Sequence, residues 1–378
     1  MLIKFHVENF KSFDKPLTFD LGHSGSYEFN TEAVQDGVVT KGIVYGFNGC
    51  GKSNLGLAMF DIVTHLTDME RLKANYFPYL NLDSAPKPAT FQYLFRFNGI
   101  EVSYHYQKAE WNYLLRESLS INGEEVISYD FTKSKGSPVR LAGAETLNLN
   151  LHSNIYSGNI SRVKFIRNNA ILEKNETNKA FQDFMNFVDG MLLFYSLERI
   201  GYQGYRVGVD NIQEFIINAG KIDEFSSFLQ ENNINLRLSK GESGGETILL
   251  ADFPKKQIPF ARVASSGTKA LTLFYYWKLQ MEHTSFVFMD EFDAFYHFEL
   301  AESVVKLLLK SFPKTQVIFT THNTDLLSND ILRPDCYFWL NDSSIKPLCD
   351  LTDKDIRKAH NLQKMFKAGV FQEGGGHA

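Results

Sequence analysis

The beginning of the chain combines two hydrophobic patterns. Residues 2–10 alternate between apolar and polar side chains, and a turn at Asp14-Lys15-Pro16 follows, which together predict a β-hairpin. Residues 42–46, GIVYG, form a short apolar run that indicates a buried strand. Residues 53–69, SNLGLAMFDIVTHLTDM, have the spacing of a helix. The sequence therefore predicts a strand, a glycine-rich turn and a helix in succession.

The middle of the chain changes from a strand pattern to a helix pattern. Residues 90–130 contain alternating runs around Asn98-Gly99 and Asn122-Gly123, and Asn-Gly pairs are strong signals for hairpin turns. Residues 163–240 are richer in helical spacing, as in NKAFQDFMNFVDGMLLF at 178–194. We therefore expect a small antiparallel sheet followed by a helical lobe.

From about residue 258 the chain alternates between helix and strand patterns. Residues 264–280 and 299–312 have helical spacing, whereas TSFVFMD at 284–290 and TQVIFTTH at 315–322 are apolar runs that indicate buried strands. This order is typical of a parallel sheet flanked by helices. We predict an α/β fold with a mixed or parallel sheet, an antiparallel β lobe and a helical lobe.

The predicted organisation is one split domain over residues 1–378. It comprises an N-terminal half at 1–65, a β-rich lobe at 66–160, a helical lobe at 161–244, a C-terminal half at 245–355, and a C-terminal helix and tail at 356–378. The final residues, GGGHA, are expected to be disordered.

Composition excludes few classes of protein, but together with the start of the chain it indicates where in the cell the protein is expected. Hydrophobic residues make up 44% and charged residues 22%, as in soluble globular proteins, and the net charge of -5 provides no global attraction to DNA or anionic membranes. The start MLIKFHVENF lacks the apolar core of a signal peptide, and no apolar run is long enough to span a bilayer. Three cysteines form no disulfide framework. A cytoplasmic protein is expected.

The segment GFNGCGKSNL has the spacing of a phosphate-binding loop between a strand and a helix. Glycines allow backbone N–H groups to approach phosphate oxygens, and the helix N-terminus favours an anion. Lys52 is expected to reach the β- and γ-phosphates, and the Ser53 hydroxyl to bind Mg²⁺. The candidate nucleotide-binding residues are Gly46, Asn48, Gly49, Cys50, Gly51, Lys52, Ser53 and Asn54.

Two later strands end in polar residues that suit nucleotide hydrolysis. FVFMDE ends in Asp290, a candidate Mg²⁺ ligand, and Glu291, a candidate general base for the attacking water. His322 follows the next apolar strand and is expected at the same sheet edge, where its imidazole can contact a γ-phosphate oxygen or the water. The catalytic candidates are therefore Glu291 and His322.

The segment ASSGTK begins a predicted helix and offers hydroxyls and free N–H groups to an anion. It lies about 20 residues before FVFMDE, so we expect the connecting helix to carry it far from the chain's own loop. A second copy of the chain would then supply the phosphate. The candidates are Ser265, Ser266, Gly267, Thr268 and Lys269. An ordinary helix N-cap is the alternative interpretation of the serines.

Taken in order, these motifs resemble those of ABC-type ATPases. GFNGCGKS resembles their Walker A motif, FVFMDE their Walker B motif with its catalytic glutamate, TTH their switch histidine, and ASSGT their signature motif LSGGQ. Ser266 and Thr268 replace the first glycine and the glutamine of that signature. The resemblance also implies a D-loop residue, Asp293, and a weaker nucleotide contact, Lys11 in the opening VENFKSF, which resembles the SMC-like (chromosome maintenance and repair) branch.

This resemblance implies an Mg²⁺-dependent ATPase that forms a head-to-tail homodimer around ATP, or a higher even oligomer. ATP rather than GTP is implied only by the family. The resemblance does not identify the Q-loop glutamine, for which Gln92, Gln182 and Gln203 remain candidates.

The compact layout is similar to ATPases of the overcoming-lysogenization-defect and abortive-infection group. That similarity implies a switch subunit in anti-phage defence that controls a separate effector, such as a nuclease or toxin, without a membrane partner. The alternative is an SMC-like DNA repair or recombination ATPase, with candidate DNA contacts at Lys133, Lys135, Arg140, Arg162, Lys164 and Arg167. A solvated basic face is the simpler explanation of those residues. A scaffold that binds nucleotide without hydrolysing it is a third hypothesis, against which Asp290, Glu291 and His322 count.

Overall fold

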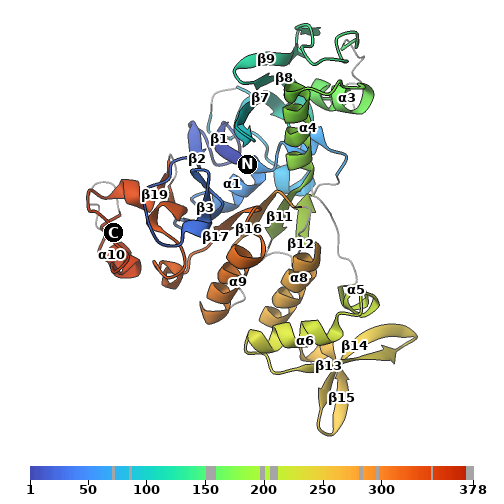
Figure 1. The fold of residues 1–378 in the computed structure, drawn as a ribbon, viewed down its shortest axis with the longest axis vertical. Helices are drawn as coiled ribbons and strands as arrows, with labels where there is room; N and C mark the ends of the chain where they lie inside the picture. Colours follow the sequence, from blue (N-terminus) through green and yellow to red (C-terminus); the bar gives the residue numbers. More distant parts are fainter. Residues whose placement is uncertain are drawn as a thin grey trace.

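The computed structural model describes residues 1–69, 73–84, 87–149, 159–195, 201–204, 212–280, 284–294, 298–341 and 344–371. Figure 1 shows three parts along the longest axis: an antiparallel sheet with α3 and α4 at the top, a central sheet, and a small sheet with α5 and α6 at the bottom. The expected GGGHA tail lies outside the described residues. Among the described residues, no helix is long and apolar enough to cross a bilayer.

The central sheet has the strand order β12-β11-β16-β17-β5-β18-β19. The five inner strands are parallel to their neighbours, and only the edge strands β12 and β19 run antiparallel. Its strands are β5 (Lys41–Tyr45), β11 (Met191–Tyr195), β12 (Gly201–Gly204), β16 (Phe286–Asp290), β17 (Gln316–Thr320), β18 (Tyr337–Leu340) and β19 (Ile345–Pro347). The predicted α/β fold with a mixed, mainly parallel sheet is confirmed.

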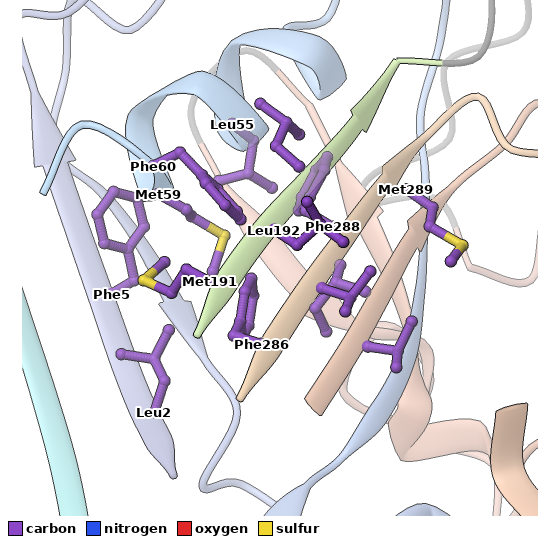
Figure 2. Close-up of a cluster of buried hydrophobic side chains, with 14 of the residues drawn as sticks. Leu2, Phe5, Leu55, Met59, Phe60, Met191, Leu192, Phe286, Phe288 and Met289 are labelled. Atoms are coloured by element: carbon purple, nitrogen blue, oxygen red, sulfur yellow. The ribbon is translucent and has the colours of Figure 1, made fainter. Parts of the chain in front are cut away.

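Helix α1 (Lys52–Met59) packs on this sheet through an apolar face. Figure 2 shows Leu55 and Met59 of α1 in one cluster of buried side chains with Leu192 of β11 and Phe288 of β16. Gly56 allows this close approach, because a Cβ there would lie 2.6 Å from the Phe288 ring. Helix α1 is therefore held close to β16, the strand that carries the Walker B segment.

The lateral sheet, β10-β9-β8-β7-β6-β1-β2, is entirely antiparallel. Both predicted Asn-Gly hairpin turns are confirmed, since all four turn residues have the positive φ angles of such turns. The strands are β1 (Leu2–Glu8), β2 (Leu17–Asp20), β6 (Ala89–Phe97), β7 (Ile100–Glu110), β8 (Tyr113–Ile121), β9 (Glu124–Asp130) and β10 (Lys135–Gly136). The opening hairpin, also predicted, is part of this sheet.

The helical pattern predicted for residues 163–240 is partly wrong. Helices α3 (Arg162–Asn169), α4 (Glu176–Asp189), α5 (Ile212–Asn218) and α6 (Ile222–Glu231) are present, but MLLF of the segment 178–194 belongs to β11. Gly190 ends α4, and the following apolar run is buried within the sheet between β12 and β16. A fully buried strand lacks the alternation that distinguishes it from a buried helix.

The distal lobe comprises residues 212–263. It contains α5, α6, the sheet β13 (Arg237–Ser243), β14 (Glu246–Phe253) and β15 (Lys256–Pro259), and the short helix α7 (Phe260–Val263). The sequence pattern did not predict this three-stranded sheet. Helix α8 (Ser266–Gln280) leads from the lobe towards β16, and α9 (Phe298–Ser311) connects β16 to β17, both as predicted. The remaining α-helices and strands of the described residues are α2 (Val63–Leu66), α10 (Leu362–Lys367) and the small pair β3 (Val34–Gln35) and β4 (Val38–Val39).

Candidate functional site

The site lies where three adjacent parallel strands end. Strand β17 lies between β16 and β5, so the residues that follow these strands meet at one sheet edge. Lys52 follows β5, Asp290 ends β16 with Glu291 directly after it, and His322 follows β17. Side-chain contacts connect these residues, as described below. The arrangement expected from the sequence is therefore the one that the structure contains.

Glycines are required at specific positions of the loop Gly46–Ser53. A Cβ on Gly46 would lie 2.5 Å from the Cys50 Sγ and 2.5 Å from the Leu340 carbonyl oxygen. Gly49 and Gly51 have φ angles of +81° and +102°, which other residues rarely adopt. The Cys50 side chain is buried, whereas Asn48 and Gly49 are exposed. The loop thus keeps its outer backbone open to a ligand.

Lys52 directs its amine into the loop. Its Nζ donates to the carbonyl oxygens of Gly46 and Phe47 at 3.0 and 3.1 Å, and lies 3.3 Å from His322 Nδ1. Burial lowers the pKa of Lys52, and the nearby Cys50 thiol and the carboxylates of Glu291 and Asp290 oppose that shift. The amine is thus held by weak acceptors that phosphate oxygens can replace.

His322 connects Lys52 with Glu291. Its Nε2 lies 3.1 Å from Glu291 Oε1, on the opposite side of the ring from Lys52. An ammonium group can only donate, so His322 Nδ1 must accept from Lys52 and Nε2 then carries the proton that is donated to Glu291. One neutral tautomer satisfies both contacts. The exposed His322 ring therefore ties the loop to the candidate base.

Asp290 and Glu291 have different surroundings. Burial raises the pKa of Asp290, and hydrogen bonds from the Ser53 and Thr320 hydroxyls oppose that shift. Glu291 has a φ angle of +43°, a left-handed conformation that is unfavourable for a side chain of this kind. A backbone outlier at this position indicates that the surrounding contacts hold the turn in place.

The Asp293 side chain forms its hydrogen bonds within its own chain. Its carboxylate accepts hydrogen bonds from Thr321 and Asn323, and these contacts oppose the rise in pKa that burial causes. The D-loop candidate is thus attached to the His322 segment in this structure. Its contact across a dimer stays a prediction.

The signature candidates lie at the start of α8, next to the distal lobe. Ser265 caps the helix, because its Oγ accepts from the Thr268 N–H at 3.1 Å and contacts the Thr268 hydroxyl at 2.9 Å. Ser265, Ser266 and Lys269 are exposed, Gly267 is partly exposed and Thr268 is buried. The ordinary N-cap role of Ser265 is therefore present. An additional role towards a partner's phosphate stays a prediction.

Lys11 is not brought to the loop. Its Nζ contacts the carbonyl oxygens of Asn75 and Pro78 at 3.0 and 3.4 Å, and burial lowers its pKa. The neighbouring Ser12 does approach the loop, since its Oγ accepts from Asn54 Nδ2 at 2.9 Å. Sequence reasoning selected the charged residue of this turn and missed the hydroxyl.

Two further sets of candidates are placed by the structure. Of the three candidate glutamines, only Gln203 is on a central-sheet strand, β12, whereas Gln92 is on β6 and Gln182 on α4.

Among the basic candidates, Arg162 is buried beneath the Tyr129 ring, so its expected place on a solvated face is wrong. Arg140, Lys164 and Arg167 form ion pairs with Glu124, Asp68 and Asp189, and Lys133 and Lys135 are exposed.

Comparison with known proteins identifies one domain family. Residues 210–328 match the family described as "AAA domain, putative AbiEii toxin, Type IV TA system". This stretch contains the signature candidates, the Walker B segment and His322. No curated protein matches the chain.

Two solved structures are similar to this chain over most of their length. The chain is 17% identical to the "SMC head domain from Thermotoga maritima". The match covers 92% of this chain and 98% of that chain, and its TM-score is 0.44. It is 16% identical to the SmcHead in the structure of "the SmcHead bound to the C-winged helix domain of ScpA", covering 91% and 96% with a TM-score of 0.43. The family match supports the predicted resemblance to nucleotide-binding ATPases over residues 210–328, and the central sheet has the mainly parallel topology expected for them.

Proposed function

We propose that the chain is an ATP-binding and ATP-hydrolysing switch subunit that dimerises around ATP and controls a separate effector protein. The observation that carries this proposal is the contact chain Lys52–His322–Glu291, which joins the phosphate loop to the candidate base across two sheet strands. A nucleotide bound in the loop would change the environment of all three side chains at once.

The residues of the site have separate roles in this proposal. Lys52 binds the β- and γ-phosphate oxygens, and the loop N–H groups bind the same anion. Glu291 orients the attacking water and accepts its proton, while His322 holds the Glu291 carboxylate on its Nε2 side. Lys52, Glu291 and His322 can fill these roles together because the central sheet places the ends of their strands side by side.

The donor set at this edge fits Mg²⁺. The Ser53 hydroxyl and the Asp290 carboxylate are oxygen ligands, which this cation prefers, and they are close enough to hydrogen-bond to each other. Burial of Asp290 also makes its charged form more dependent on a cation. Bound Mg²⁺ would neutralise charge on the β- and γ-phosphates.

The effector proposal draws on the family description. That description names a toxin and a type IV toxin–antitoxin system, which supports a pairing of this ATPase with a second component. A role in anti-phage defence, with a nuclease or toxin as effector, is the form we favour. Homodimers or higher even oligomers in the cytoplasm would be the active species.

The alternative proposal is an SMC-like ATPase that acts on DNA. Lys133, exposed in the turn between β9 and β10, and Lys135, exposed at the start of β10, are the basic candidates that favour it. Binding through phosphate contacts would weaken with salt, with a log–log slope that counts the contacts. Salt-independent or undetectable DNA binding would remove this alternative.

ATP hydrolysis by purified variants tests the proposed function. Lys52→Ala should lose nucleotide binding, and hydrolysis should fall by about 10²–10³, the range for removing one donor that stabilises the transition state. Glu291→Gln should keep binding and lose hydrolysis by about 10²–10⁴, since it lacks the base. Lys174→Ala, at an exposed position just before α4, is the matched control. Wild-type protein without Mg²⁺-dependent hydrolysis would refute the proposal.

A further inference from the structure

Thr320 lies at the centre of the site, and it is the first residue of the TTH segment, in which only the histidine was a candidate. It is the last residue of β17, the strand between β16 and β5, and its side chain is fully buried. Its neighbours are therefore the Walker B strand on one side and the strand that leads into the phosphate loop on the other.

Three hydrogen bonds connect Thr320 to consecutive residues of the Walker B turn. Its Oγ1 donates to Asp290 Oδ1 at 2.8 Å, and accepts from the Glu291 N–H at 2.7 Å. Its carbonyl oxygen accepts from the Phe292 N–H at 3.3 Å. One hydroxyl proton and one lone pair satisfy both side-chain contacts without conflict.

These bonds act on the two features of the turn that need support. The left-handed φ of +43° at Glu291 is unfavourable by itself, and the Thr320 hydroxyl bonds the N–H of that residue. The same hydroxyl fixes one oxygen of the Asp290 carboxylate, to which the Ser53 hydroxyl also forms a hydrogen bond. A β-branched threonine in a strand has a restricted χ1 angle, so the hydroxyl is held in this direction.

We propose that Thr320 is a positioning residue that sets the orientation of Asp290 and Glu291 together, so that the metal ligand and the base stay in register. This inference rests on the proposed ATPase function. The Thr320 hydroxyl bonds the Asp290 carboxylate and the Glu291 backbone N–H, so it acts through these two residues.

Thr320→Val tests the proposal, because valine has nearly the same shape and lacks the hydroxyl. We expect kcat for ATP hydrolysis to fall about 10–100-fold, the range for removing an outer-shell partner of a metal ligand, with KM changing less than about threefold. Mn²⁺ binding to the nucleotide-loaded protein, measured by EPR, should weaken by about tenfold. The affinity for fluorescent MANT-ATP in EDTA should stay within about threefold, because the loop is unchanged.

Two further variants separate positioning from general packing. Thr320→Ser keeps the hydroxyl and should retain kcat and Mn²⁺ affinity within about threefold of the wild type. Thr315→Val removes a buried hydroxyl just before the opposite end of the same strand, where it donates to the Thr284 carbonyl at 3.0 Å, and should leave both quantities unchanged. If Thr320→Val does not fold, Thr320→Ala compared with Thr320→Ser gives the same contrast.

The outcomes distinguish this inference from the proposed function. If the wild type does not hydrolyse ATP, the proposed function fails first. If the wild type is active and Thr320→Val matches it in kcat and Mn²⁺ affinity, or Thr315→Val loses as much, the positioning role of Thr320 is wrong.

Discussion

His322 contacts Lys52 of the phosphate loop through Nδ1 and the candidate base Glu291 through Nε2. Its position after an apolar strand predicted its place at the sheet edge, and that place is confirmed by the 3.1 Å contact with Glu291. Its simultaneous contact with Lys52 depends on residues 270 positions apart in the sequence. Spacing within a motif cannot encode such a distance, because it is set by strand order.

Thr320 is a second residue whose contacts depend on strand order and not on spacing within a motif. The motif TTH drew attention to the histidine, whereas the hydroxyl two residues earlier makes the contacts with Asp290 and Glu291. In the sequence, a threonine at the end of an apolar strand is explained by β propensity alone. Only the pairing of β16 with β17 distinguishes it from the neighbouring strand residues.

Lys41 provides a residue-scale prediction of pH dependence. The lysine is fully buried, and its Nζ donates to the Thr315 carbonyl at 2.8 Å. Burial lowers the pKa of Lys41 from 10.5 to about 8. Between these values the unfolded chain binds a proton that the folded chain lacks, so the free energy of unfolding rises with pH.

The comparison of wild type with Lys41→Met isolates this effect. We expect the wild type to gain roughly 1–3 kcal/mol relative to the variant between pH 7.5 and 10. Urea denaturation at several pH values measures the difference. A difference that stays flat across this range would show that the folded pKa of Lys41 is close to its ordinary value.

At the scale of elements, the sequence predicted those with a distinct local pattern. The Asn-Gly hairpins, α9 and the apolar strands β16 and β17 follow from periodicity and turn chemistry. Strand β11 was missed because its apolar residues are buried in the middle of the sheet, and the preceding Gly190 was its only local boundary. Gly190, which ends α4, was the available sequence signal for the start of β11.

The helix predicted for residues 53–69 is interrupted after α1 for a reason visible only in three dimensions. Asp61 lies in the break before α2 and forms a fully buried ion pair with Lys108 of β7, at 2.6 Å. The Tyr106 and Tyr79 hydroxyls donate to the same carboxylate at 2.9 and 3.0 Å. This network attaches the end of the phosphate-loop helix to the lateral sheet.

Removing one partner of this pair should destabilise the fold. Lys108→Ala leaves the Asp61 carboxylate without its cation, which costs about 3–5 kcal/mol for a buried pair. The double variant Asp61→Asn/Lys108→Met should recover part of this loss, since neither charge remains. Urea denaturation measures both, with the exposed Lys135→Ala as control. A loss below about 1 kcal/mol in Lys108→Ala would mean that the buried carboxylate is compensated by other groups.

At the scale of the whole molecule, the phosphate loop and the signature candidates belong to different parts. Lys52 and Glu291 are at the edge of the central sheet, whereas Ser265 follows α7 of the distal lobe. The sequence order predicted this separation. We interpret it as a composite site, in which the signature segment of one chain faces the nucleotide of another.

Mixing two inactive variants tests the composite site. Ser265→Arg should bind ATP and fail to hydrolyse it, because a long cation at the helix start blocks closure. Mixed with Lys52→Ala, it should regain part of the activity, since each mixed dimer contains one intact pair of loop and signature. Ser227→Arg, at an exposed position of α6 in the same lobe, is the control. Normal hydrolysis by Ser265→Arg alone would exclude the composite model.

The most direct measurement of the ATP clamp is native mass spectrometry of Glu291→Gln purified with ATP and Mg²⁺. Without its base the variant should retain the nucleotide, so we predict a dimer, or a larger even assembly, that carries one ATP for each chain. A second polypeptide in the same assembly would identify the effector, and bound nucleic acid would favour the DNA alternative. A monomer without nucleotide under these conditions would contradict the account.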